Sequence, residues 1–156
     1  MGAGKSSVGA SLAEVLKWPF IDLDTTIEAG QGLTIRQIFE QAGEPFFRAV
    51  ERAALEEVIK TEPAVVALGG GTFAQPSNLE LIQARGGPTI WLECAPEELY
   101  RRCQGITNRP LFRDRASFDH LLQQRLPYYE RAEYRVSTDG HTAGQIAEQI
   151  LSLHLF

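Results

Sequence analysis

The stretch MGAGKSSVG, at residues 1–9, decides how the rest of the chain is interpreted. Gly4, Lys5 and Ser6 match the end of the phosphate-binding pattern G-x-x-x-x-G-K-[ST], whose first glycine would fall before Met1. Glycines let several backbone N–H groups converge on phosphate oxygens, and a helix that begins near Lys5 points its positive end at the same anion. Lys5 would then reach the outer phosphates and the Ser6 hydroxyl would bind Mg²⁺. The alternative is a flexible N-terminus that contains GAGKS by chance.

A phosphate-binding loop of this kind also requires a strand in front of it, and none stands before Gly2 in this sequence. We therefore expect Met1 to be an interior residue of a longer protein, with about ten residues absent from the front.

Behind this stretch, helical and strand-like patterns alternate. Short apolar runs, typical of buried strands, lie at 20–23, 64–68, 89–92 and 134–136. Helices are predicted at 5–16, from Thr34 to Gly43, and at 45–60, 76–84, 96–103, 117–131 and 143–151. This alternation predicts an α/β fold, a parallel sheet covered by helices on both faces, in a single domain over residues 1–156. Residues 104–116 lack periodicity and carry three arginines, so they are predicted to form a mobile lid loop.

Composition narrows the class of protein. With 44% hydrophobic residues the chain can fill one core, and a net charge of −5 argues against a nucleic-acid partner. A few arginines can still build a local pocket for a small anion. Cys94 and Cys103 have neither metal-ligand nor redox spacing, and the apolar runs are too short to cross a bilayer. We expect a cytoplasmic protein that binds neither nucleic acid nor membranes.

Two aspartates follow the first apolar run. At the carboxyl end of a parallel strand, Asp22 and Asp24 can both turn into a ligand crevice. One would hold a water on Mg²⁺, while the other accepts the proton of a hydroxyl nucleophile. The alternative is that Asp24 only caps a following helix.

Glycines and arginines supply the other candidates. Gly69–Gly71 follow the second apolar run, where they allow a close approach of a ligand, or form a loose turn. Arg48 is either a surface ion-pair partner of Glu44 and Glu51, or a guanidinium that Glu51 holds toward a substrate carboxylate. In the loop Arg109 would neutralise a transferring phosphoryl group, and Arg125 lies on the next helix. Together these residues predict phosphoryl transfer from a nucleoside triphosphate to a small anionic acceptor.

The chain contains, in this order, the stretches MGAGKSSVG, FIDLDTTIE, IFEQAGEPFFRAVE, LGGGT, NRPLF and QRLPYYE. On these it resembles the shikimate kinase family, P-loop kinases of the shikimate pathway to chorismate, from Met1 to about Leu153. Many NTPases share the first stretch, whereas the ordered set DLD, FR-x-x-E, GGG, RP and R-x-P-x-Y is specific. The resemblance implies a five-stranded parallel sheet of order 2-3-1-4-5 whose first strand is missing here, and a monomer.

The resemblance also implies roles for single residues. ATP and Mg²⁺ would be held by Gly2, Ala3, Gly4, Lys5, Ser6 and Ser7, with Ser6 on the metal and Asp22 behind its water shell. Asp24 would bind a shikimate hydroxyl and act as the base. Arg48 and Arg125 would hold the shikimate carboxylate, Glu51 would orient Arg48, and Gly69, Gly70 and Gly71 would take a hydroxyl. Arg109 would meet the ATP phosphates, and Arg102 would lie under the adenine.

The sequence departs from the family at two places. The first strand and first loop glycine are absent, so we expect the 156-residue chain to bind ATP weakly or not at all. Some members place an arginine against adenine before the last helix, where this chain has Asp139-Gly140-His141-Thr142. Two other functions compete: another small-molecule kinase, such as a gluconate or nucleoside monophosphate kinase, and a non-catalytic domain that only binds a ligand.

Overall fold

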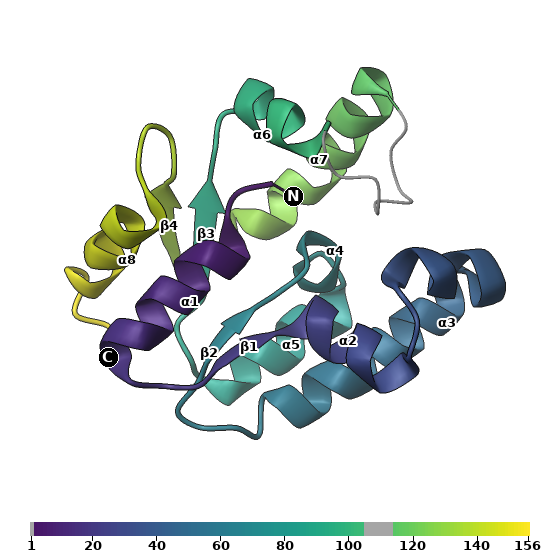
Figure 1. The fold of residues 1–156 in the computed structure, drawn as a ribbon, viewed down its shortest axis with the longest axis horizontal. Coiled ribbons are helices and arrows are strands. Elements are labelled where there is room, and N and C mark those ends of the chain that lie inside the picture. Colours follow the sequence, from purple (N-terminus) through teal and green to yellow (C-terminus); the bar gives the residue numbers. More distant parts are fainter. Residues whose placement is uncertain (1, 105–113) are drawn as a thin grey trace.

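The computed structural model describes residues 2–104 and 114–156, and Figure 1 shows helices packed around short strands. Its elements, in chain order, are α1 (Lys5–Leu16), β1 (Phe20–Asp22), α2 (Leu23–Gln31), α3 (Ile35–Val58), β2 (Val65–Ala67), α4 (Gly70–Phe73), α5 (Pro76–Arg85), β3 (Ile90–Glu93), α6 (Pro96–Cys103), α7 (Arg115–Tyr129), β4 (Tyr134–Ser137) and α8 (Ala143–Leu151). The predicted alternation of helices and strands is therefore present. None of the helices described is long and apolar enough to cross a membrane.

The strands form two parallel pairs. β1 pairs with β2 in the register Phe20↔Val65, and β3 pairs with β4 in the register Ile90↔Tyr134. Both pairs are parallel, as predicted, but no hydrogen-bonded ladder joins β2 to β3 in the part of the chain described. A groove of about 780 Å³ separates them and is lined by residues of both strands. The single five-stranded sheet of order 2-3-1-4-5 is thus not observed and stays a prediction.

Several predicted helix boundaries have the expected local cause. Thr34 caps α3 in a reciprocal capping box, in which Gln37 N donates to Thr34 Oγ1 at 3.2 Å and Thr34 N donates to Gln37 Oε1 at 2.8 Å. Gly43, at φ 78°, interrupts the helical backbone where the sequence predicted a stop. Proline begins both α5 and α6. Proline lacks a backbone N–H, and in the first turn of a helix that N–H would have no acceptor within the helix, so no hydrogen bond is lost.

Two predicted boundaries were wrong, and one of two alternatives at the glycines did not form. The strand predicted at 20–23 ends at Asp22, because the Asp22 carboxylate caps α2 by accepting hydrogen bonds from Asp24 N at 3.1 Å and Thr25 N at 3.4 Å. Of the two alternatives for Gly69–Gly71, the loose turn does not form, since Gly70 and Gly71 are the first residues of the short helix α4. α7 begins at Arg115 rather than at 117, because Asp114 makes a capping box with Ser117.

Three apolar clusters fix the elements that carry the candidate residues. α1 packs on α8 and β4 through Val8, Leu12, Val136, Ile146 and Ile150. α2 packs on α3 through Leu23, Ile27, Ile38, Phe47 and Leu55. α6 packs on α7 through Leu99, Cys103, Phe118 and Leu122. A buried side chain of this size stabilises the fold by about 1.5–3 kcal/mol, so the start of α1, the start of α2 and the end of α7 are held in place.

Candidate active site

The phosphate-binding loop enters α1 through two glycines in the left-handed region, Gly2 at φ 65° and Gly4 at φ 86°. A Cβ on Gly2 would also lie 3.1 Å from Cys103 Sγ and 3.2 Å from the carbonyl oxygen of Leu99, so the loop packs closely on α6. Lys5 is the first residue of α1. Because the first-turn N–H groups of a helix have no partner within it, this geometry suits an anion.

Ser6 and Asp22, both predicted for the metal site, lie in contact. Ser6 Oγ donates a hydrogen bond of 2.5 Å to Asp22 Oδ2, which joins the first turn of α1 to the carboxyl end of β1. A hydroxyl and a carboxylate are hard oxygen donors, which fit Mg²⁺. Among the residues described, no three of the types His, Cys, Asp and Glu cluster around a point where a metal would bind. Mg²⁺ here would therefore need phosphate and water oxygens as well.

The predicted acceptor residues converge on the glycines before and within α4. A Cβ on Gly69 would lie 2.9 Å from Asp24 Oδ1, and a Cβ on Gly71 would lie 2.9 Å from Arg48 Nη1 and 3.1 Å from Arg125 Nη2. Residues more than 100 positions apart in the sequence thus meet at one turn, which Figure 1 shows next to the end of α7. Only glycines leave space for them here.

Arg48 is held by two carboxylates of its own helix. Its Nη1 contacts Glu51 Oε2 at 2.8 Å and its Nη2 contacts Glu44 Oε1 at 2.9 Å. Burial works to lower the pKa of Arg48, but the hydrogen bonds and charges of Glu51 and then Glu44 outweigh it, so this pKa lies above its usual value. Arg48 retains 19% side-chain exposure, whereas Glu51 retains 2%, so Glu51 forms the inner wall.

Helix α7 supplies the side chains that approach the glycines from the side opposite Arg48. Arg125 is buried, and Tyr129, one turn further on, donates a hydrogen bond of 3.2 Å from its hydroxyl to the carbonyl oxygen of Gly70. Two guanidinium groups from α3 and α7 therefore flank one glycine, an arrangement that suits a carboxylate.

We expect Gly71→Ala to weaken acceptor binding. Its added Cβ must displace the tips of Arg48 and Arg125 by a few tenths of an ångström, and misplaced binding groups are costly, so the acceptor KM should rise about three- to tenfold. Gly87→Ala is the matched control, because a Cβ there would meet nothing within 4 Å. Steady-state kinetics of both variants decide this, and an unchanged KM in Gly71→Ala would contradict the arrangement.

The remaining predicted residues lie elsewhere or outside the described residues. Arg102 Nη1 donates to the carbonyl oxygen of Gly2 at 3.3 Å and its Nε donates to Glu98 Oε1 at 2.7 Å. Hydrogen bonds from Arg101 and then from Arg102 lower the pKa of Glu98 to about 2. Arg102 thus lies against the phosphate-binding loop, and its contact with adenine stays a prediction. Arg109 and residues 105–113 of the predicted lid lie outside the described residues.

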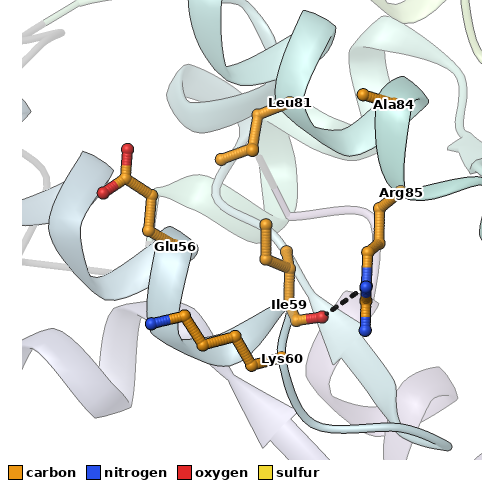
Figure 2. Close-up of a pocket in the computed structure, with 6 residues that line it drawn as sticks. All are labelled: Glu56, Ile59, Lys60, Leu81, Ala84 and Arg85. Atoms are coloured by element: carbon orange, nitrogen blue, oxygen red, sulfur yellow. Dashed lines mark hydrogen bonds between the residues drawn. The ribbon is translucent and has the colours of Figure 1, made fainter.

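Three buried or half-buried residues at this site were not predicted: Thr72, Asn78 and Tyr129. Thr72 directly follows Gly69–Gly71, and Tyr129 is the last residue of the R-x-P-x-Y stretch. Both therefore lie in or next to sequence motifs that could have pointed to them. A separate hollow of about 430 Å³ lies between the end of α3 and α5. Figure 2 shows its lining residues, among which Arg85 Nε donates a hydrogen bond of 2.9 Å to the carbonyl oxygen of Ile59. None of the candidate residues lines it.

The residues predicted to bind phosphate and those predicted to bind the acceptor thus lie beyond the carboxyl ends of β1 and β2, the arrangement expected of the P-loop class of small-molecule kinases. Within that class the chain belongs to the shikimate kinase family, whose family model, described as "Shikimate kinase", matches residues 1–154. It is 40% identical to the shikimate kinase of Moorella thermoacetica, over 96% of this chain and 87% of that protein. It is 38% identical to the shikimate kinase of Persephonella marina, over 97% of this chain and 92% of that protein. The shikimate kinase of Acinetobacter baumannii, solved in complex with shikimate, matches with a TM-score of 0.94 at 38% identity, over 99% of this chain and 88% of that one.

Proposed function

We propose that this chain transfers the γ-phosphoryl group of ATP to the 3-hydroxyl group of shikimate. The observation that carries this proposal is the convergence of Arg48, Arg125 and Asp24 on the Gly69–Gly71 backbone, because it offers two cations for a carboxylate and a base for a hydroxyl within one site. The shared family, and a similar structure solved with shikimate, support the choice of acceptor.

In this mechanism Arg48 and Arg125 bind the acceptor carboxylate and Asp24 accepts the proton of the attacking hydroxyl. A bond forms between the hydroxyl oxygen and the γ-phosphorus, the bond from that phosphorus to the β–γ bridging oxygen breaks, and ADP leaves. Lys5 and the loop amides would bind the phosphates. Ser6 and Asp22 would hold Mg²⁺, which neutralises phosphate charge when bound. Arg109 is proposed to add a further positive charge.

A panel of acceptors tests the proposal against its rivals. ADP release should depend on shikimate and not on gluconate or a nucleoside monophosphate. Phosphorylation of gluconate alone would assign the chain to another small-molecule kinase. ATP binding without turnover of any acceptor, in this chain and in a chain extended at its front, would identify a non-catalytic binding domain.

We also propose that one extended strand lies between β2 and β3 and completes a five-stranded parallel sheet. The groove there is lined by apolar residues of α1 and of both strands. Those of the strands include Val66 and Ala67 in β2 and Ile90 and Leu92 in β3. In the described residues each of the two strands has a ladder on one side only, and an unpaired edge accepts another strand.

A front extension of about ten residues, rich in valine and isoleucine, should therefore raise the midpoint of thermal unfolding. Two or three buried apolar side chains at about 1.5–3 kcal/mol each predict a rise on the order of 10 °C. Differential scanning calorimetry measures it, and an extension of equal length made of glycine and serine is the control. Equal midpoints for the two extensions would contradict the proposed strand.

We propose that the protein is a monomer and that it works in the cytosol. Cys94 and Cys103 are buried free thiols, which is consistent with a reducing compartment. Burial raises the pKa of Cys94, so its thiolate is disfavoured and a reactive role is not proposed for it.

A further inference from the structure

A buried hydrogen-bond network lies behind Arg48. Glu51, Thr72 and Asn78 expose only 1%, 0% and 2% of their surface. The two oxygens of the Glu51 carboxylate have different partners: Oε2 accepts from Arg48 Nη1 at 2.8 Å, and Oε1 accepts from Thr72 Oγ1 at 2.7 Å. The hydroxyl of Thr72 therefore fixes one end of the carboxylate whose other end holds Arg48.

Asn78 fixes Thr72 in turn. Its Nδ2 donates to the carbonyl oxygen of Thr72 at 3.2 Å, and Arg52 Nη1 donates to the carbonyl oxygen of Ser77 at 2.6 Å. These bonds tie α4 and α5 to α3, the helix that carries both Arg48 and Glu51. The network thus sets where the glycine backbone lies relative to the Arg48 guanidinium.

Thr72 also lies behind the glycine nearest to the proposed base. Thr72 Oγ1 and Asp24 Oδ1 each lie 2.9 Å from the position that a Cβ on Gly69 would take. The Thr72 hydroxyl therefore lies close both to Asp24, the proposed base, and to Glu51, the carboxylate that orients Arg48. A side chain at residue 69 would displace one or the other.

We infer that Thr72 is a positioning residue for acceptor binding, acting through Glu51 on Arg48; this rests on the function proposed above. A buried carboxylate oxygen that loses its donor is costly, so without the hydroxyl Glu51 turns to find another partner. Arg48 then moves with Glu51 and presents its guanidinium out of line with Arg125. The expected effect falls on acceptor binding and leaves the phosphate-binding loop unaffected.

Thr72→Val tests this, because valine keeps the shape of the side chain and removes the donor. The KM for shikimate should rise about tenfold, the scale expected for a buried acceptor left without its donor, while kcat and the KM for ATP stay within about twofold. Thr72→Ser restores the hydroxyl and should return the KM to near its original value. If the valine variant fails to fold, Thr72→Ala, which is smaller and also lacks the donor, takes its place.

Two further measurements separate positioning from a loss of stability. Thr138→Val is the matched control, since Thr138 is also buried and donates to the carbonyl oxygen of Glu93 at 3.0 Å, away from α3 and α4. It should lower the unfolding midpoint without raising the KM for shikimate. In an Arg48→Ala background, Thr72→Val should raise the KM no further, because it acts through the side chain already removed.

An unchanged KM in Thr72→Val, or an equal rise with and without Arg48, would overturn the inference. A failure of the proposed function appears differently, as a wild-type chain that phosphorylates another acceptor. The same variants measured with that acceptor then decide the role of Thr72.

Discussion

Asp24→Asn is expected to lower kcat by ~10²- to 10⁴-fold, the usual contribution of a general base, while the dissociation constant for ATP changes less than about twofold. Asparagine fills the same space but cannot take the proton of the attacking hydroxyl. Asp24 Oδ1 lies beside Gly69, on the acceptor side of the site, so nucleotide binding should not depend on its charge. Quenched-flow or coupled ADP-release kinetics, together with calorimetric titration of ATP, measure the two quantities.

The structure removes one confounding effect from this experiment. The carboxylate that caps α2 is that of Asp22, so Asp24→Asn leaves the cap in place and should alter stability little. Asp119→Asn, which weakens a surface ion pair with Arg115 at 2.8 Å, serves as the control and should leave kcat unchanged. A wild-type rate in Asp24→Asn would show that another group accepts the proton.

Arg48→Ala is expected to raise the KM for shikimate about 10- to 150-fold, since a charge-assisted bond is worth roughly 1.5–3 kcal/mol. Arg48→Lys should recover only part of the affinity, because a lysine keeps the charge but loses the planar fork that contacts Glu44, Glu51 and a carboxylate together. The KM for ATP should stay near its original value in both variants.

Removing Arg48 also leaves the buried Glu51 carboxylate without its cation, so the unfolding midpoint must be measured beside the KM. Arg36→Ala, which removes an exposed i,i+4 pair with Glu40 on the same helix, is the matched control. If ATP binding weakened in Arg48→Ala while shikimate binding did not, the assignment of Arg48 to the acceptor would fail.

The features that the sequence predicted correctly depend on residues close together in the chain. The Thr34 cap, the stop at Gly43, the prolines that begin α5 and α6, and the pairing of Arg48 with Glu51 all act within one or two turns. Short-range patterns of this kind can be read without knowing the tertiary structure.

The features that escaped prediction depend on contacts across the fold. Asp22 accepts a hydrogen bond from Ser6, which is 16 residues earlier, and Thr72 donates one to Glu51, which is 21 residues earlier. Helix α4 forms in a glycine-rich segment with low intrinsic helix propensity, so its packing against α7 and α5 decides its conformation. No local pattern contains these partners.

A crystal structure of the protein with shikimate and ADP tests the central claim most directly. We expect the shikimate carboxylate within roughly 2.7–2.9 Å of nitrogen atoms of both Arg48 and Arg125, and the reacting hydroxyl of shikimate within hydrogen-bond distance of Asp24, facing the phosphate-binding loop. Shikimate bound away from the Gly69–Gly71 backbone, with Asp24 out of reach of every hydroxyl, would contradict it.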